Sequence, residues 1–352
     1  MPELPEVETI VRDLAPLITG ARIVHARAGW PRMIVHPAAD EFPEAIRGRV
    51  IEAVGRRAKW IVIELSGGLV LVIGVRMTGQ VFVVPQETPG DRHVHLGISL
   101  EDGRELRLRD MRKFARVGVY RRLPDGALAG WSPGAGEREL GDPFRRHGPE
   151  PLDERFTLGV FRRRLRARRG RLKPLLLDQK FVAGIGNIYA DEALWRARLH
   201  PLRTVGTLAP ADERRLYRAI REVLAEAIER RGSSVDDYTA PSGDGEMQEH
   251  LAVYQRTALP CLRCGRGLRR IALGGRGTHF CSWCQRLPAA DRAAAAKLLR
   301  EERRSPGVRA GQVTEATRRA AATRRAQARR GIRWTELPAG EGVVGLRPGE
   351  GR

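Results

Sequence analysis

Two pairs of cysteines constrain the fold of this 352-residue chain more than any other feature of its sequence. Cys261 and Cys264 are separated by two residues, as are Cys281 and Cys284, and 16 residues lie between the pairs. No cysteine occurs elsewhere, and two incidental pairs would not explain this spacing. Four thiolates so arranged form the closed tetrahedral site of structural zinc. We therefore expect one Zn²⁺ that holds a fold and leaves no open position for catalysis.

The segment between the two cysteine pairs has the pattern of a β-hairpin. Residues 269–273 and 278–280 have strand character, and the glycine-rich residues 274–277 form the expected turn. This arrangement displays Arg276 at the tip. An arginine in a turn is often only solvated, but on a rigid zinc hairpin of a basic protein it favours contact with a DNA groove or phosphate.

The chain carries a large positive charge. Lysine and arginine total 63 against 42 acidic residues, which gives a formal net charge of +21 and a pI of about 11.1. Arginine suits forked contacts with phosphate, so a polyanion is the expected partner, although a GC-rich coding bias would give a similar composition. The longest apolar runs, such as residues 69–73, have only strand length, and the N-terminus is acidic. We therefore expect a cytoplasmic protein without membrane contact.

The first part of the chain changes from a helical to a β pattern. Apolar residues recur at helical spacing over residues 6–18, which predicts a short amphipathic helix. Pro5 suits the first turn of this helix, and Glu6 lies near the positive end of its dipole. Residues 50–122 then alternate apolar runs with glycine turns, which is typical of a β-sandwich or flattened barrel.

The second part of the chain is predicted to be helical. Glycine, proline and charged residues dominate residues 127–151, which predicts a linker. Helices are expected beyond it at residues 157–169, 173–178, 188–198 and 210–231. Residues 289–352 hold 15 basic and 7 acidic residues and are expected to form a mobile or partly helical tail. The sequence thus predicts an α+β protein with two compact halves and a zinc module.

Six stretches, taken together and in this order, resemble the bacterial formamidopyrimidine-DNA glycosylases. They are MPELPEVETI at 1–10, RRAKW at 56–60, DMRKF at 110–114, LDQ at 177–179, AGIGNIYADE at 183–192 and GRGTHFC at 275–281. The resemblance implies an N-terminal β-sandwich, a helix-two-turn-helix domain and a C-terminal zinc-finger β-hairpin. With it, we expect a catalytic domain at 1–124, a linker at 125–151, a DNA-binding helical domain at 152–250, the zinc finger at 251–287 and the basic tail at 288–352.

The resemblance also implies the catalytic residues. In this family the N-terminal proline is the nucleophile, so Met1 must be removed and Pro2 attacks C1′ of the damaged nucleotide. A terminal amine has a pKa near ~8, which leaves a useful neutral fraction at neutral pH. Glu3 is implied as the acid and base, and Lys59 as a lysine that contacts the phosphate of the lesion. Taken singly, they would be an ordinary start residue, a first-turn carboxylate and a solvent-facing strand lysine.

The resemblance implies six DNA contacts. Met77, Arg112 and Phe114 match the trio that fills the duplex when the damaged nucleotide is flipped out, a role suited to an apolar wedge, a forked donor and a ring. The phosphate contacts it implies are Lys173, Asn187 and Arg276. Gly184 and Gly186, just before Asn187, are expected to let DNA approach backbone amides at a helix N-terminus.

The chain also departs from the family pattern. Many members carry histidine at the position of Gly74, proline at that of Met111 and glycine at that of Ala115, so a phosphate contact is expected to be missing at Gly74. Glu6 matches a carboxylate near the damaged base, although a favourable place at a helix start explains it equally well. The basic tail is extra, and we interpret it as a nonspecific DNA tether or a neutral extension.

These features predict a bifunctional glycosylase and abasic-site lyase that removes oxidised purines, chiefly 8-oxoguanine and formamidopyrimidines, and cuts the strand by β- and δ-elimination. Its expected partner is double-stranded DNA with oxidised bases or abasic sites. We expect the protein to be a monomer and to act at the bacterial nucleoid. Leu4 favours the oxidised-purine branch, since the endonuclease VIII branch, which acts on oxidised pyrimidines, usually has glycine there. The other alternative is a non-catalytic, zinc-dependent damage sensor. We expect the shape of the pocket and residues 233–248 to determine which damaged base is recognised.

Overall fold

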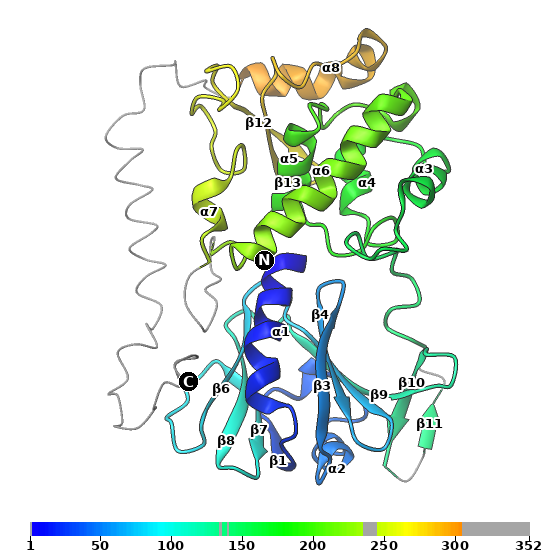
Figure 1. The fold of residues 1–352 in the computed structure, drawn as a ribbon. Helices are drawn as coiled ribbons and strands as arrows, with labels where there is room; N and C mark the ends of the chain where they lie inside the picture. Colours follow the sequence, from blue (N-terminus) through cyan, green and yellow to red (C-terminus); the bar gives the residue numbers. More distant parts are fainter. Residues whose placement is uncertain (1, 134–135, 139–140, 235–244, 305–352) are drawn as a thin grey trace, which may run out of the picture. The chain divides into compact units, whose positions relative to one another are not determined.

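The computed structural model describes residues 2–133, 136–138, 141–234 and 245–304, which lie within one compact unit spanning residues 1–313. These residues form an α+β fold, as expected, with β-sheets in the first half and helices in the second (Figure 1). None of the helices in the described ranges combines the length and the apolar character that a membrane crossing needs.

Two sheets make up the β half. The four-stranded sheet has the order β1-β7-β8-β6, with β1 (Ile23–Ala28), β7 (Val94–Leu100), β8 (Arg104–Asp110) and β6 (Gly79–Pro85). The larger sheet has the order β11-β10-β9-β5-β4-β3, with β11 (Gly136–Arg138), β10 (Leu128–Ser132), β9 (Arg116–Arg122), β5 (Leu69–Gly74), β4 (Trp60–Leu65) and β3 (Ile51–Arg57). The short β2 (Ile34–His36) pairs with β9 in parallel, and α2 (Phe42–Ile46) follows it. Apolar side chains from both sheets form one continuous core, so the predicted sandwich is confirmed.

The first helix, α1 (Leu4–Ile18), connects the two halves of the protein. Pro5 occupies its first turn, and the Glu6 carboxylate accepts a hydrogen bond from the Glu3 amide at 2.8 Å. Val7 and the apolar residues after it belong to the core of the sheets, whereas Leu4 belongs to the core of the helices. Figure 1 shows the N-terminus at this junction. The start of the chain is therefore fixed between the sheets and the helices.

The second half contains the predicted helices with small shifts of their ends. They are α3 (Leu158–Arg166), α4 (Leu172–Leu177), α5 (Asn187–Arg196) and α6 (Pro210–Glu229). The short helix α7 (Met247–His250) is an addition that the sequence pattern did not predict. The long helix α6 begins at a proline and is followed by Gly232 at φ +73°, a conformation that glycine adopts without strain. Short 3₁₀ turns occur at Pro31–Met33 and Val205–Thr207.

Two predictions about connecting segments need correction. The proposed linker at 127–151 contains β10 and β11, because Leu128–Ser132 continues the sheet by pairing with β9. In the zinc hairpin, β12 (Arg269–Leu273) and β13 (Arg276–Phe280) are joined by Gly274 and Gly275 alone, both with positive φ. Arg276 is therefore the first residue of a strand, and it is exposed.

The tail predicted from residue 289 onward begins with a packed helix. In α8 (Ala289–Arg304), Ala295 is buried in a cluster with Leu273 of the zinc hairpin. The Asp291 carboxylate accepts hydrogen bonds from the hydroxyls of Thr204 and Thr207 at 2.7 and 2.8 Å. The rest of the predicted tail, residues 305–352, lies outside the described residues.

Candidate functional site

Glu3 lies beside Pro2 and is held at the N-terminus of α5. Its side chain is 1% exposed, and its carboxylate accepts hydrogen bonds from the amides of Gly186 and Ile188 at 2.7 and 2.9 Å. The Tyr189 amide approaches the same group at 3.4 Å. These donors are the free N–H groups of a helix start, which favour a negative charge. The fold therefore fixes one carboxylate next to the first residues of the chain.

This contact corrects our interpretation of the glycines before Asn187. A Cβ atom at Gly186 would lie 2.2 Å from the Glu3 carboxyl carbon, and one at Gly184 would lie 2.6 Å from a methyl group of Leu4. The glycines thus make room for the N-terminal segment of the protein. The amides that we expected to face DNA are occupied by Glu3.

Glu6 is a buried carboxylate with partners from three parts of the chain. Besides the Glu3 amide, it accepts hydrogen bonds from the Ser233 amide at 2.8 Å and from the Tyr189 hydroxyl. Burial is the largest cause that raises the pKa of Glu6, and the nearby Glu3 carboxylate raises it further. Glu6 therefore ties the start of the chain to α5 and to the segment after α6, which agrees with the structural explanation of this residue.

Lys59 lies in a hairpin turn, whereas the sequence suggested a place inside a strand. Arg57 pairs with Trp60, so Ala58 and Lys59 form the two-residue connection between β3 and β4. Glu150 holds this turn by accepting hydrogen bonds from the Ala58 amide and the Arg57 guanidinium, both at 2.6 Å. Because it lies in the turn, Lys59 projects towards the start of the chain, whereas a position in a strand would direct its side chain across the sheet.

The pKa of Lys59 is lowered from its ordinary value, and desolvation by burial is the largest cause. Arg276 and Arg76 lower this pKa further, while Glu3 and Glu6 oppose the shift. A lysine in this environment is neutral in a larger fraction of molecules near neutral pH than an exposed lysine is.

A cavity of about 560 Å³ brings the predicted residues together. Pro2, Lys59 and Arg276 all line it, although they are far apart in the sequence. One wall comes from residues 143–147 and another from residues 177–180, between α4 and α5. A proline, a lysine and an arginine thus surround a space large enough for a nucleotide-sized group.

The predicted duplex-filling residues lie at one end of the four-stranded sheet. Met77, Arg112 and Phe114 are all exposed, and the Arg112 guanidinium lies 4.9 Å from the centre of the Phe114 ring. Asp110, which is fully buried, accepts hydrogen bonds from the amides of Arg112, Phe114 and Ala115 at 3.2, 2.7 and 2.8 Å and from the Thr78 hydroxyl. A buried carboxylate therefore shapes the loop that displays Arg112 and Phe114, and it also binds the Thr78 hydroxyl next to Met77.

The predicted phosphate contact at Lys173 needs correction. Lys173 is 0% exposed, and its Nζ lies 2.7 Å from Asp191 and donates to the Gly277 carbonyl and the Thr278 hydroxyl at 3.0 and 2.9 Å. The ammonium group therefore makes one ion pair and two hydrogen bonds within the protein. Lys173 connects α4, α5 and the zinc hairpin just beside Arg276. Asn187, half-buried, donates to the same Gly277 carbonyl at 3.1 Å.

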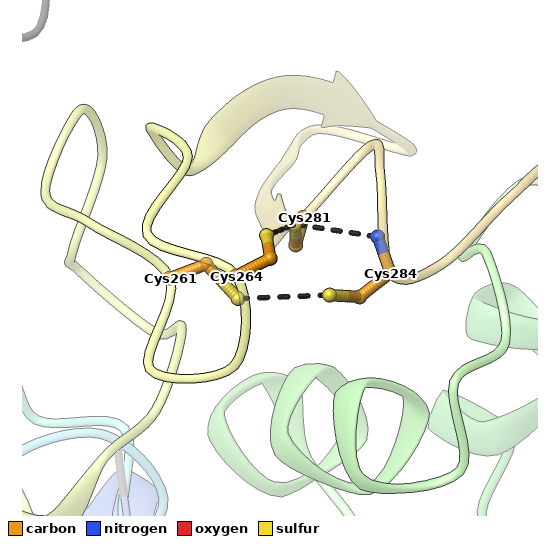
Figure 2. Close-up of side chains that lie close together, drawn as sticks. All are labelled: Cys261, Cys264, Cys281 and Cys284. Atoms are coloured by element: carbon orange, nitrogen blue, oxygen red, sulfur yellow. Dashed lines mark hydrogen bonds between the residues drawn. The ribbon is translucent and has the colours of Figure 1, made fainter.

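The four cysteines converge into one cluster, as the sequence predicted. Their sulfur atoms all lie within 4.8 Å of one another, with 4.0 Å between Cys261 and Cys284 and 3.5 Å between Cys264 and Cys281 (Figure 2). Tetrahedral sulfur ligands of zinc lie about 3.8 Å apart, so this donor set fits one structural Zn²⁺. The site holds the β12–β13 hairpin and contributes no chemistry of its own.

The fold and the site together define a zinc-finger protein of the class that processes DNA. Three family models match in order along the chain: the formamidopyrimidine-DNA glycosylase N-terminal domain at residues 1–117, its H2TH domain at 147–239, and the zinc finger found in FPG and IleRS at 258–287. The chain belongs to the formamidopyrimidine-DNA glycosylase family.

Relatives with this name are similar over nearly their whole length. The formamidopyrimidine-DNA glycosylase of Chloroflexus aurantiacus is 47% identical over 287 residues, which cover 81% of this chain and 98% of the relative. That of Pelotomaculum thermopropionicum is 44% identical over 288 residues, which cover 82% of this chain and 100% of the relative. Among solved structures, a Lactococcus lactis FPG mutant in complex with DNA containing Fapy-dG has a TM-score of 0.72 at 35% identity, covering 81% of this chain and all of that one. The MutM (FPG) protein of Thermus thermophilus has a TM-score of 0.68 at 40% identity, and the match covers 82% of this chain and 100% of that one.

Sequence reasoning missed two residues of the site. Asp110 stands within the DMRKF stretch, but only its burial reveals it as the acceptor that shapes the loop. Arg76 lines the cavity, and its left-handed backbone, with φ +56°, has no signal in the sequence. The neighbouring TG dipeptide at Thr78 and Gly79 was a turn signal that could have directed attention to this segment.

Proposed function

We propose that this chain is a bifunctional DNA glycosylase and abasic-site lyase of bacterial base excision repair, with oxidised purines as substrates. The observation that carries the proposal is the meeting of Pro2, Lys59 and Arg276 around one cavity, with the Glu3 carboxylate fixed beside Pro2. Structures of relatives with DNA containing Fapy-dG or an abasic site support the substrate class. Such a substrate supports a location in the cytoplasm, at the nucleoid.

The reaction begins with the secondary amine of Pro2, once Met1 has been removed. Its nitrogen attacks C1′ of the damaged nucleotide, the bond from C1′ to the base breaks, and the base leaves with a proton. The sugar ring opens to an iminium ion, which withdraws electrons from C2′. Loss of a C2′ proton then expels the 3′ phosphate, and a second elimination expels the 5′ phosphate. Neither step needs a metal, since the iminium is the electron sink.

Glu3 and Lys59 supply the proton transfers. The amides at the start of α5 fix the orientation of the Glu3 carboxylate, so it can give a proton to the ring oxygen of the sugar and take one from C2′. Lys59, whose pKa is lowered by burial, gives up a proton more readily than an exposed lysine does, and it contacts the phosphate of the lesion. The roles of these two groups differ because one is fixed by helix amides and the other lies on a hairpin turn.

Binding of the duplex uses the exposed loop residues and the zinc hairpin. Met77 and Phe114 enter the space left by the flipped nucleotide, and Arg112 pairs with the orphaned base. Arg276 binds the DNA backbone from the start of β13, and Asn187 binds a phosphate at the start of α5. Zn²⁺, held by the four cysteines, keeps this hairpin folded.

Borohydride trapping on lesion-containing duplexes tests the proposal. Duplexes with 8-oxoguanine, an oxidised pyrimidine or no lesion are incubated with the protein and borohydride, and Pro2→Gly is the comparison. We expect a covalent adduct on 8-oxoguanine DNA, formed at least about tenfold faster than on the oxidised pyrimidine, since one pocket contact separates substrates by this much. The opposite preference would favour an endonuclease VIII type of activity. Tight binding without an adduct on any damaged or abasic duplex would leave only a damage sensor.

A further inference from the structure

Trp60 fills the space in front of Gly74. Gly74 ends β5, and a Cβ atom built there would lie 2.5 Å from Cζ3 of the Trp60 indole. Phe144 packs against the same indole edge to face, with ring centres 6.4 Å apart. While Trp60 occupies this place, no side chain can project from position 74 into the cavity. At this position the Trp60 indole therefore takes the place that a side chain of residue 74 would occupy.

Arg76 reaches the same place from two residues further along the chain. Its backbone has φ +56°, a left-handed conformation that costs energy for any residue except glycine. Its guanidinium carbon lies 4.8 Å from the centre of the Trp60 ring, within cation–π distance. Glycine would adopt this backbone conformation without strain, yet the residue is an arginine that stacks on Trp60 at the cavity wall. This strain indicates that the arginine side chain has a function.

The cavity has an excess of positive charge around Arg76. Its cationic lining residues are Lys59, Arg76, Arg146, Lys180 and Arg276, and Asp178 is its one carboxylate. Within the described residues, no carboxylate forms an ion pair with Arg76. Arg76 is exposed, and the charged group that acts on its pKa is another cation, Arg116, which lowers this pKa together with partial desolvation. A bound anion would supply the balance.

We propose that Arg76 binds a backbone phosphate of the DNA strand that enters the cavity, and so provides from the turn after β5 the contact that Gly74 cannot make. The inference rests on the proposed function. A guanidinium offers two parallel donors to phosphate oxygens, and the Trp60 indole holds its plane in place. Lys59 and Arg276 line the same cavity, so a phosphate at Arg76 would lie among three cations.

The test is the salt dependence of binding to a duplex that carries a tetrahydrofuran abasic analogue. Arg76→Gly removes the side chain at a backbone conformation that glycine prefers, and Arg76→Gln keeps a planar group over Trp60 without the charge. For both variants we expect roughly tenfold weaker binding at about 0.1 M salt, and a slope of log Kd against log salt that is smaller by about one. Arg47→Ala is the matched control, because Arg47 is an exposed arginine that pairs with Glu44 at 3.1 Å. It should change the slope far less.

The outcomes separate this inference from the proposed function. If both Arg76 variants match Arg47→Ala in Kd and slope, Arg76 does not bind phosphate. If Arg76→Gly weakens binding but Arg76→Gln keeps the wild-type slope, the side chain supports Trp60 and the inference is equally overturned. Borohydride trapping of wild-type protein on an abasic duplex is run alongside. Its failure would count against the proposed function, whereas its success with unchanged Arg76 variants would overturn the Arg76 contact alone.

Discussion

Lys173 is a buried cation whose contacts all lie within the protein. Its ammonium group joins Asp191 of α5 to the backbone of the zinc hairpin, and burial lowers its pKa while Asp191 opposes that shift. Asp191 also accepts a hydrogen bond from the His279 amide at 2.8 Å. Removing one partner of such a pair leaves an uncompensated buried charge.

Replacing Lys173 with methionine should therefore lower the free energy of unfolding by about 3–5 kcal/mol. Denaturant unfolding of the zinc-loaded protein measures this loss. Lys180→Met, at an exposed lysine, should stay within about 0.5 kcal/mol of wild type. Equal stability of the two variants would mean that the buried network contributes nothing to the attachment of the hairpin.

His200 should make the protein sensitive to acid. It is buried, its Nδ1 accepts a hydrogen bond from the Leu202 amide at 3.1 Å, and burial lowers its pKa to about 4, with Asp291 opposing the shift. In the unfolded chain His200 takes up a proton near pH 6.5, so the stability that its neutral form gives the folded protein is fully present above that pH. About 3 kcal/mol of the free energy of unfolding is lost as the pH falls towards 4.

Unfolding of wild type and His200→Asn, compared from pH 7 to pH 4, checks this expectation. The asparagine keeps an acceptor but cannot titrate, so the variant should lose less stability across this range. Exposed His25→Asn serves as the control and should follow wild type. Parallel curves for wild type and His200→Asn would show that another group controls the acid limb.

The loop after β8 depends on one carboxylate for its shape. Asp110→Ala would leave the amides of Arg112, Phe114 and Ala115 without their acceptor. We expect faster hydrogen exchange at these amides and at least about tenfold weaker binding to an abasic-analogue duplex, because an unordered loop must be fixed at the moment of binding. Asp102→Ala, in an exposed turn, should change neither quantity. Unchanged exchange at the loop in Asp110→Ala would contradict this explanation.

Elements with strong local signals could be predicted from the sequence, whereas contacts between distant elements could not. The cysteine spacing and the apolar periodicity of α6 depend on neighbouring residues, and both predictions are confirmed. The carboxylate of Glu3 on the amides of α5 joins residues more than 180 positions apart, so no local pattern indicates this contact, and the resemblance led us to expect DNA at those amides. Lys173 was misplaced for the same reason, since its burial depends on the docking of the zinc hairpin.

At the scale of the whole molecule, the positive charge continues beyond the described residues. Residues 305–352 contain ten basic and four acidic residues, and α8 before them is packed through Asp291 and Ala295. A cut after residue 304 therefore removes charge without opening the packed cluster, whereas a cut after residue 288 removes both.

Truncation after residue 304 should weaken binding to undamaged duplex by about three- to tenfold at about 0.1 M salt and lower the salt slope, with the same melting temperature as wild type. Truncation after residue 288 should also lower the melting temperature, because α8 covers part of a buried cluster. If the shorter deletion leaves affinity and salt slope unchanged, the tail is a neutral extension and no tether.

In the reaction we propose, Pro2 is the nucleophile of the mature chain. Wild-type protein is trapped with borohydride on an abasic duplex, digested, and analysed by mass spectrometry for the peptide that carries the sugar. We expect a reduced adduct on the nitrogen of Pro2 in a chain without Met1, and no adduct in protein that retains Met1. An adduct on Lys59, or equal trapping with Met1 retained, would contradict it.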